Sequence, residues 1–258
     1  MREVEMSVDK KSECFALMAA LPSEGNLLLS HLRVAQTNTY GDLEIIRGTF
    51  HDKEVLVVFS GLGKINAAAG AAAVFAQFSV SSFWMWGSAG AYPHSGLRLN
   101  DVALASEEIL GDEGVLTSSS WKPLDAIGIP LAKNKDHPVF NRIPVDKFQL
   151  KRARLLLNDW QATSSGPRLH VGPFVTVSGV SGSPARARLL GDRFGALCEN
   201  MEGGAAALVC LRYQVPFLEI RGLSNWAGDR NKKRWHLAEA LENCQRIVLY
   251  LLESWHQL

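Results

Sequence analysis

Short apolar runs alternate along the chain with longer segments whose apolar residues recur at helical spacing. The runs predict buried strands, and the longer segments predict helices that pack on a sheet. Strands are expected at residues 14–21, 43–50, 54–60, 82–87, 101–109, 168–178 and 216–223. Helices are expected at residues 23–33, 65–78, 146–160, 200–212 and 234–255. The last of these carries an apolar stripe of Leu237, Leu241, Cys244, Val248 and Leu251.

This alternation favours an α/β sandwich around a mainly parallel sheet. No change of composition marks a linker, so residues 1–258 are expected to form one domain. The least regular stretch is 111–144, which holds four prolines and is expected to be a long excursion from the sheet. Such excursions are often lids or contact segments, and the sequence leaves both roles open.

The charge balance and the cysteines narrow the function classes. A net charge of +1 disfavours a basic nucleic-acid coat or a polybasic membrane patch. No apolar run is long enough to span a bilayer, and residues 1–12 lack the apolar core of a secretory signal. The four cysteines show neither C-x-x-C spacing nor a zinc-ligand cluster, which favours a reduced cytoplasmic protein without a metal.

Polar and glycine-rich residues directly follow the predicted strands. In parallel sheets the carboxyl ends of strands carry the ligand site, so these residues are its candidates. They are Glu24, residues 61–64, residues 87–90, residues 178–182 and the pair 224–225. The two glycine turns fit neither the dinucleotide nor the Walker pattern, so a nucleotide-cofactor site is disfavoured.

Two charged residues at strand or helix ends require an explanation. Arg221 lies near the end of a core strand and needs a partner when buried, with Glu219 too close in sequence to be the obvious one. Glu202 is expected in the first turn of a helix. A carboxylate there interacts with the helix dipole and can also accept hydrogen bonds from two vicinal hydroxyls.

Four ordered elements resemble the nucleoside phosphorylase/nucleosidase superfamily over nearly the whole chain. They are residues 61–64 (Gly-Leu-Gly-Lys), 87–90 (Gly-Ser-Ala-Gly), 201–203 (Met-Glu-Gly) and 220–225 (Ile-Arg-Gly-Leu-Ser-Asn). The chain is similar to the hydrolytic branch that includes the methylthioadenosine/S-adenosylhomocysteine nucleosidases, and within it to the futalosine hydrolases of menaquinone biosynthesis. The resemblance implies a three-layer sandwich with a mixed, mainly parallel central sheet flanked by helices. It also implies a homo-oligomer that needs no cofactor and acts on a purine nucleoside.

The resemblance also assigns roles around the sugar. It places Glu24 at the carboxylate that activates water, with Ser88 and Arg221 helping to hold that water. Glu202 matches the glutamate that binds the ribose 2′- and 3′-hydroxyls, and Met201 packs on the sugar. Hydrolysis is favoured over phosphorolysis because a carboxylate at Glu24 repels phosphate and can deprotonate water. Arg47 and Arg98 are present but lie outside any phosphate motif.

At the base, Asn225 stands where the adenine-specific nucleosidases carry an aspartate, and Ser224 precedes it as in the family. Hypoxanthine presents two acceptors, N7 and O6, and the two N–H donors of an asparagine amide match them. An unmatched buried polar group costs about 1–3 kcal/mol, so Asn225 favours a 6-oxopurine leaving group. Futalosine carries hypoxanthine as its base.

Some features depart from the adenine-specific enzymes. Pro22 and Gly25 flank Glu24, and Gly182 stands where those enzymes stack a phenylalanine on the base. The candidate stacking residues are Phe174, Phe194, Trp121 and Trp226. Three alternatives stay open: a nucleosidase for methylthioadenosine, S-adenosylhomocysteine or aminodeoxyfutalosine, a phosphorylase acting on inosine, and a nucleoside-binding protein without catalysis.

Overall fold

The computed structural model describes residues 14–163 and 166–256, so the expectation about residues 1–12 lies outside the described part. The larger strands are β1 (Cys14–Ala19), β2 (Arg33–Tyr40), β3 (Leu43–Phe50), β4 (Lys53–Phe59), β5 (Ser82–Ala91), β6 (Val102–Leu110), β12 (Leu169–Thr176) and β14 (Phe217–Trp226). The short strands are β7 (Val115–Leu116), β8 (Trp121–Lys122), β9 (Ala132–Asn134), β10 (His137–Val139), β11 (Arg142–Pro144) and β13 (Cys198–Asn200). The α-helices are α1 (Asn26–Ser30), α2 (Lys64–Gln77), α3 (Lys147–Thr163), α4 (Pro184–Phe194), α5 (Gly203–Tyr213) and α6 (Leu237–Ser254). Short 3₁₀ helices are η1 (Pro22–Glu24), η2 (Leu124–Ile127) and η3 (Lys232–Arg234).

Within the described residues, ten strands form one mixed sheet whose centre is parallel. Strand β1 pairs in parallel with β4 and β5, and β5 pairs in parallel with β14. Strand β14 also pairs antiparallel with β6, so β5, β14, β6, β12 and β13 close into a ring. The expected mixed, mainly parallel α/β sheet is confirmed, but the plain three-layer sandwich is wrong because part of the sheet closes on itself.

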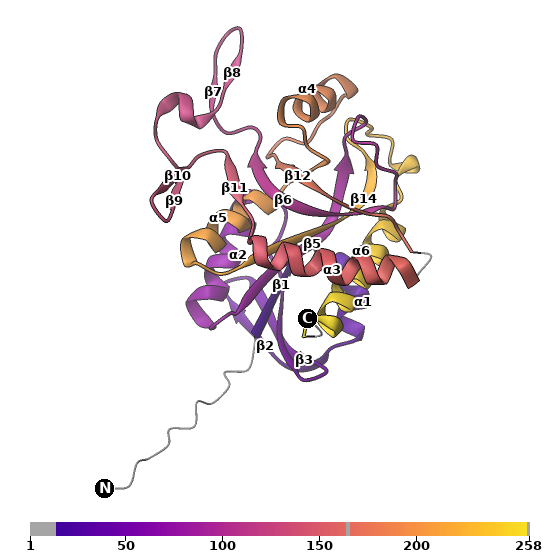
Figure 1. Cartoon of the computed structure of the whole chain (residues 1–258). Helices are drawn as coiled ribbons and strands as arrows, with labels where there is room; N and C mark the ends of the chain where they lie inside the picture. Colours follow the sequence, from indigo (N-terminus) through magenta and orange to yellow (C-terminus); the bar gives the residue numbers. More distant parts are fainter. Residues whose placement is uncertain (1–13, 164–165, 257–258) are drawn as a thin grey trace, which may run out of the picture.

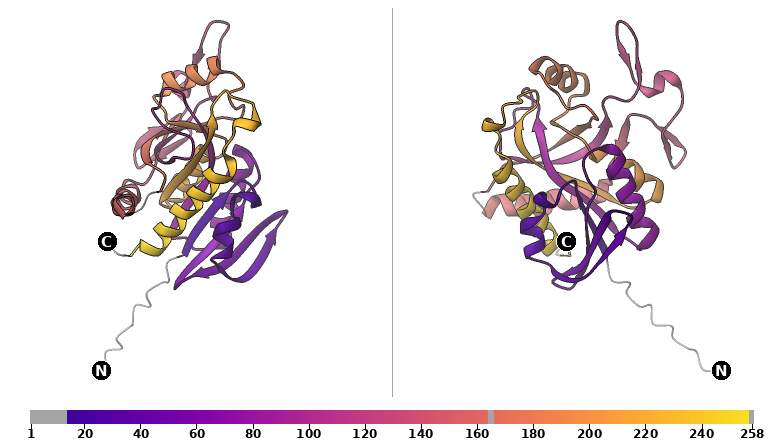
Figure 2. Two further views of the ribbon diagram at one scale, coloured as in Figure 1. Left: turned by 90° about the vertical axis from the view of Figure 1, so that its right-hand side faces the viewer. Right: turned by 180° about the vertical axis from the view of Figure 1, so that it is seen from behind.

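Helices cover both faces of this sheet, as Figures 1 and 2 show. Helices α2 and α5 pack on one face, where alanines of both helices allow a close approach. Helices α1, α3 and α6 cover the other face. The apolar stripe of α6 is buried as predicted, except that Leu237 in the first turn is 43% exposed.

The sequence pattern misplaced several elements. The helix expected at 23–33 is a 3₁₀ turn followed by the short helix α1, and β2 begins at Arg33. Strand β2 was missed because most of its side chains are exposed, which leaves no apolar alternation to detect. Helix α4 and strand β13 were also missed. Helix α4 is short and broken up by charged residues, and it is fixed by a Ser183 cap, Pro184 in its first turn and Gly195 at its end.

Two expected turns are parts of strands. Residues 87–90 continue β5, and Ser224 and Asn225 lie within β14 rather than after it. The register between these strands shifts at Leu223 and Asn225, which is the behaviour of a bulge. Bulges re-aim side chains near functional sites, and this one lies at the residue expected to read the base.

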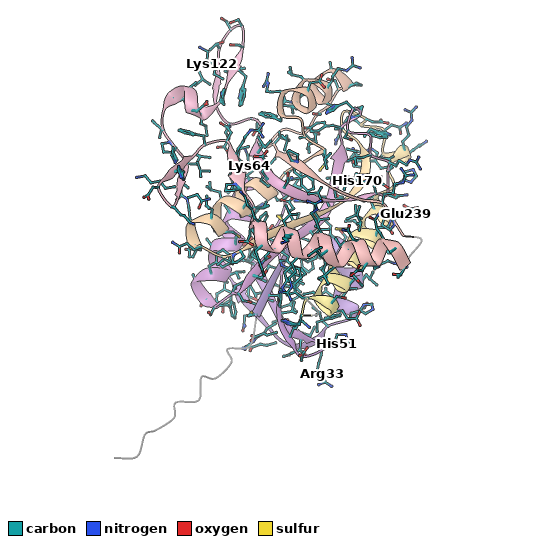
Figure 3. The ribbon with its side chains drawn as sticks, viewed as in Figure 1. Arg33, His51, Lys64, Lys122, His170 and Glu239 are labelled. Atoms are coloured by element: carbon teal, nitrogen blue, oxygen red, sulfur yellow. The ribbon has the colours of Figure 1, made fainter. Side chains whose placement is uncertain are left out.

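The stretch 111–144 is irregular, as predicted. It contains the β7–β8 hairpin, the turn η2 and the β9–β10 ribbon, and the hairpin projects from the body of the molecule (Figure 1). Figure 3 shows Lys122 on this hairpin, away from Lys64 in the body. In the described part of the chain, no helix is both long and apolar enough to cross a membrane. All four cysteines are buried free thiols.

Candidate active site

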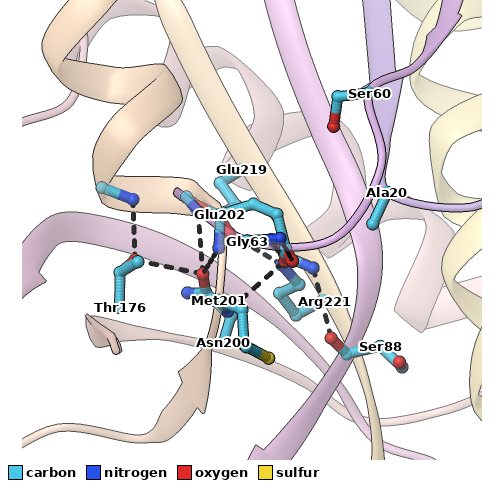
Figure 4. A network of polar contacts seen from close by, with 12 residues as sticks. Ala20, Ser60, Gly63, Ser88, Thr176, Asn200, Met201, Glu202, Glu219 and Arg221 are labelled. Carbon is cyan, nitrogen blue, oxygen red and sulfur yellow. Dashed lines mark hydrogen bonds and ion pairs between the residues drawn. The ribbon is translucent and has the colours of Figure 1, made fainter. Parts of the chain in front are cut away.

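Arg221 lies at the centre of a buried charge cluster, with 1% of its surface exposed (Figure 4). Its Nε donates to Glu219 Oε1 at 2.7 Å, and its Nη1 donates to the carbonyl of Ser88 at 3.2 Å. Its Nη2 lies 3.5 Å from Glu202 Oε2. Burial alone would lower the pKa of the guanidinium, but the Glu219 and Glu202 carboxylates outweigh it and raise that pKa. Arg221 is therefore a fixed positive charge.

The expectation that Glu219 is too close in sequence to pair with Arg221 is wrong. Both residues belong to β14, and residues two apart on a strand point to the same face. The side chains therefore run side by side toward α5. Sequence separation would have excluded this pair only on a helix, where residues two apart point in different directions.

Glu24 ends the 3₁₀ turn η1, directly after β1, and its carboxylate folds back onto the backbone. Its Oε2 accepts from the backbone N–H groups of Ala20 and Leu21, each at 3.1 Å. Its Oε1 faces the backbone N–H and hydroxyl of Ser88, at 3.3 and 3.4 Å. The side chain is 7% exposed. These bonds hold one carboxylate oxygen in place and direct the other toward Ser88.

Glycines let the groups around Glu24 approach closely. A Cβ on Gly87 would lie 2.7 Å from Arg221 Nη1 and 3.2 Å from Glu24 Oε1. A Cβ on Gly25 would lie 2.5 Å from the ring of Phe59. The Gly25 departure from the adenine-specific enzymes thus has a packing reason, and Gly87 leaves the space between the cation and the carboxylate open.

Glu202 lies immediately before α5 as its N-cap residue, not inside the first turn as expected. Its Oε1 accepts from the backbone N–H of Gly63 at 2.9 Å, and its Oε2 faces that of Met201 at 3.3 Å. The carboxylate is 3% exposed. Because a carboxylate has about four lone-pair positions, it keeps capacity for further donors such as hydroxyls.

The side chain of Asn200 binds the backbone at the start of α5, and this residue was not singled out from the sequence. Its Oδ1 accepts from the N–H groups of Glu202 at 2.9 Å and Gly203 at 2.7 Å. These are the donors that a helix start leaves unsatisfied. An asparagine shortly before a Gly-Gly-Ala helix start is a capping pattern, so the sequence held a usable indication.

Gly203 packs directly on the Glu219 carboxylate, and a Cβ there would overlap both carboxylate oxygens. Gly203→Ala is therefore expected to destabilise the fold by about 1–3 kcal/mol, measured as the free energy of unfolding in urea. Gly179→Ala is the matched control because a Cβ there meets nothing within 4 Å. Equal stability of the two variants would contradict this packing.

The amide of Asn225 is oriented by two neighbours. Its Nδ2 donates to the carbonyl of Trp226 at 3.0 Å, which only the NH₂ end of an amide can do. Its Oδ1 accepts from the hydroxyl of Ser224 at 2.9 Å. The residue is 8% exposed. The expectation of two N–H donors for the base is thus corrected: one is bonded to Trp226, which leaves one.

Glu24, Ser88, Arg221, Glu202 and Met201 are joined by the contacts described above. Ser224 and Asn225 lie beside them on β14, and the hydroxyl of Ser224 also faces the carbonyl of Ala89 on β5 at 3.4 Å. The seven candidate residues come from η1, β5, β14 and the start of α5. The topology thus gathers in one place residues that are up to about two hundred positions apart in sequence.

The four stacking candidates lie in different surroundings. Phe174 is fully buried in the core and cannot reach a ligand, so that candidate is wrong. Trp121 and Phe194 meet edge to face at 5.7 Å, with the guanidinium of Arg193 4.8 Å from the Trp121 ring. Trp226 is partly buried against the core. Through Trp121, the stretch 111–144 contacts Phe194 at the end of α4.

A salt bridge that the sequence did not reveal ties three loops together. Lys64 Nζ contacts Asp112 Oδ1 at 2.7 Å and Glu113 Oε1 at 3.0 Å. Asp112 Oδ2 accepts from the backbone N–H of Ser178 at 2.6 Å. Burial opposes the charge on Asp112, but Lys64 outweighs it and lowers the pKa of Asp112. These contacts of Lys64, Asp112 and Glu113, here called the Lys64–Asp112 clasp, join the 61–64 turn to the loop after β12. The same turn contacts Glu202 through Gly63.

Lys64→Met is expected to raise KM roughly fivefold with little change in kcat, because the clasp positions loops and its loss costs about 1 kcal/mol. Steady-state kinetics measure both constants. Lys122→Met on the projecting hairpin is the control. A fall in kcat without a change in KM would show that Lys64 acts on the chemical step instead.

The phosphate candidates lie elsewhere. Arg47 on β3 is bonded to Glu54 on β4 at 2.6 Å. Arg98 lines a separate hollow of about 820 Å³ together with Arg168 and Arg246. Among residues 14–163 and 166–256, no group of three or more His, Cys, Asp or Glu side chains is arranged to hold a metal ion.

A family model described as the phosphorylase superfamily matches residues 15–253. The chain belongs to this superfamily. Among curated relatives of this superfamily member, a futalosine hydrolase of Thermus thermophilus is 37% identical over 193 residues, which cover 75% of this chain and 79% of that one. A 5′-methylthioadenosine/S-adenosylhomocysteine nucleosidase of Bacillus cereus is 28% identical and covers 93% of this chain and 98% of its own.

Solved structures share the fold of this superfamily member. A methylthioadenosine/S-adenosylhomocysteine nucleosidase of Neisseria meningitidis superimposes with a TM-score of 0.80 at 22% identity, over 94% of this chain and 99% of that chain. A futalosine hydrolase of Helicobacter pylori gives 0.78 at 20% identity, over 94% and 98%. The predicted resemblance to the hydrolytic branch of the superfamily is confirmed by these relatives, which are named as nucleosidases or hydrolases.

Proposed function

We propose that this chain hydrolyses the N-glycosidic bond of futalosine to hypoxanthine and dehypoxanthine futalosine, on the futalosine route to menaquinone. The observation that carries the proposal is the orientation of the Asn225 amide, whose Nδ2 bonds Trp226 with one N–H and keeps the other, while one lone pair of its oxygen accepts from Ser224. The remaining N–H donor fits the N7 or O6 acceptor of hypoxanthine. The relative named futalosine hydrolase supports the same substrate.

Glu202 binds the ribose in this proposal. Its two oxygens accept hydrogen bonds from the 2′- and 3′-hydroxyls while Gly63 and Met201 hold the carboxylate in place. Met201 packs on the sugar. Because the carboxylate is oriented before the substrate arrives, little further ordering of the site is required.

Glu24 activates water in the proposed reaction. Two backbone donors fix one carboxylate oxygen, and the other faces Ser88, so a water bound between them can transfer a proton to Glu24. Arg221 holds Ser88 through its carbonyl and balances the charge of the carboxylates. The ribose–base bond stretches toward an oxocarbenium-like state, and Asn225 donates to the departing base as negative charge develops there.

The charge of the site favours hydrolysis over phosphorolysis. The carboxylates of Glu24, Glu202 and Glu219 surround the single guanidinium of Arg221. An excess of negative charge stabilises a cationic sugar and opposes the entry of phosphate. The proposed reaction uses neither a metal ion nor an organic cofactor.

A methylthioadenosine-type nucleosidase is the second candidate, because relatives with that name match 93% of the chain. Adenine presents an amino donor beside N7, and the amide N–H of Asn225 matches only the latter. The inosine phosphorylase and the nucleoside-binding protein have no comparable support. The cytoplasmic location and the homo-oligomer stay predictions.

The experiment gives the purified protein futalosine, inosine and methylthioadenosine separately, each with and without phosphate. Chromatography identifies the base and the sugar product. The proposal expects hypoxanthine and free sugar from futalosine at a rate that phosphate does not change. Adenine from methylthioadenosine alone would support the second candidate, sugar 1-phosphate would indicate a phosphorylase, and binding without turnover would indicate a binding protein.

A further inference from the structure

Another buried glutamate, Glu108, lies behind the site and takes part in none of the steps above. It belongs to β6 and is fully buried, and its carboxyl group lies beside that of Glu219, because Asn200 bonds both Glu108 and Gly203 and the Glu219 carboxyl packs on Gly203. Glu219 is also fully buried, and its Oε2 has no hydrogen-bond partner among the described residues. Two carboxylates in contact away from water repel each other strongly unless a proton lies between them.

A bulge in the sheet aims Glu108 at this place. Between β6 and β12 the register shifts, so that Gly172 pairs with Ala105 but Phe174 pairs with Glu108. The extra residue reverses the alternation of β6, which puts Glu108 on the face of Ala105 and Leu110 and leaves Glu107 outside with Arg142. Glu108 thus points toward the face of β14 that carries Glu219 and Arg221.

The surroundings of the two carboxyl groups differ. Glu219 accepts from Arg221 Nε at 2.7 Å and lies against Gly203 at the start of α5, so a cation and a helix N-terminus both stabilise its negative charge. Among the described residues, the donors to Glu108 are neutral: the hydroxyl of Thr176 at 2.5 Å and the amide of Asn200 at 3.3 Å. Cys198 also faces the pair, and burial keeps its thiol neutral by raising its pKa.

We propose that Glu108 carries a proton at neutral pH and donates it to Glu219, and that this pair is the anchor that positions Arg221 between Glu24 and Glu202. The shared proton satisfies the unpartnered Glu219 Oε2. It leaves the pair with one negative charge, which binds the guanidinium through Nε and directs its other two nitrogens to Ser88 and Glu202. Burial and the neighbouring Glu219 both raise the pKa of Glu108, in agreement with this protonation.

The proton has a consequence for stability that does not depend on catalysis. An unfolded glutamate has a pKa of about 4.3, so at neutral pH unfolding releases the proton that Glu108 holds in the fold. The stability that this proton contributes is fully present below the pKa of the unfolded glutamate. It is lost as the pH rises toward the raised pKa of Glu108 in the folded state. Glutamine at 108 mimics the protonated acid and has no proton to release.

The first test compares the wild-type protein with Glu108→Gln in urea unfolding between pH 6 and pH 8. The unfolding equilibrium constant of the wild-type protein, divided by that of Glu108→Gln, is expected to rise about tenfold per pH unit, which corresponds to one released proton. A ratio independent of pH would overturn the proposal. If unfolding is irreversible, infrared spectroscopy at pH 8 decides: a protonated carboxyl band that disappears in Glu108→Gln is expected, and its absence from the wild-type protein contradicts the proposal.

The positioning role rests on the proposed function and is tested by activity. Glu108→Gln is expected to keep kcat within about threefold, whereas Glu219→Gln, which removes the charge bonded to Arg221, lowers kcat tenfold or more with a smaller change in KM. Equal loss in both variants would contradict the asymmetry. If no substrate is turned over at all, the proposed function is wrong. The protonation of Glu108 is then still tested by the unfolding experiment, which does not depend on activity.

Discussion

Glu24→Gln is expected to lower kcat by roughly 10²–10⁴-fold, the range that a general base contributes, while KM changes little. Glutamine keeps the size of the side chain but cannot accept a proton from water. Its amide oxygen can still accept from Ala20 and Leu21, so the turn η1 is expected to keep its conformation. Stopped assays of hypoxanthine release measure both constants.

The control for Glu24→Gln is Glu44→Gln, an exposed position on β3 that has the same change of charge. That variant is expected to match the wild-type protein. A Glu24→Gln enzyme with a nearly normal rate would remove Glu24 from the chemistry and leave water activation without a candidate base among the contacts described here.

Asn225→Asp is expected to lower kcat/KM for futalosine by roughly 10–100-fold, because the N–H donor to the base is lost and a buried acceptor faces N7 or O6 at a cost of about 1–3 kcal/mol. A carboxylate would also face the carbonyl of Trp226, where the amide now donates. The aspartic acid therefore tends to hold a proton on the oxygen that faces Trp226, so the oxygen toward the base is an acceptor, which suits the amino group of adenine better than hypoxanthine. The same variant is expected to gain activity on methylthioadenosine.

Ser224→Ala provides a comparison for Asn225→Asp. It removes the hydroxyl that occupies the amide oxygen but leaves the donor in place, so a smaller loss on futalosine is expected and no gain on adenine nucleosides. Unchanged futalosine turnover by Asn225→Asp would show that the base is recognised by other groups.

The sequence was a reliable guide where short motifs lie on or directly after the strands of the parallel centre of the sheet. Glu24, Ser88, Glu202 and Arg221 were identified from short patterns, and the structure joins them by hydrogen bonds. The parallel centre of the sheet explains this success, because strand ends that follow each other in sequence meet at one edge. Their catalytic roles remain proposals.

The sequence was a poor guide where long-range geometry decides. The bulge that turns Glu108 inward depends on the pairing of β6 with β12, and the sequence of β6 does not show which of its two adjacent glutamates faces the core. The closure of the sheet depends on β14 pairing with two strands at once. Likewise, the Lys64–Asp112 clasp joins residues 48 positions apart, without a local pattern that predicts it.

The most direct test of the central claim is a competition between futalosine and aminodeoxyfutalosine in one reaction. The two substrates share their sugar and side chain and differ in the base, hypoxanthine against adenine. If Asn225 selects a 6-oxopurine, hypoxanthine is released roughly 10–100-fold faster than adenine at equal concentrations. Equal release of the two bases, or faster release of adenine, would contradict the assignment of futalosine as the substrate.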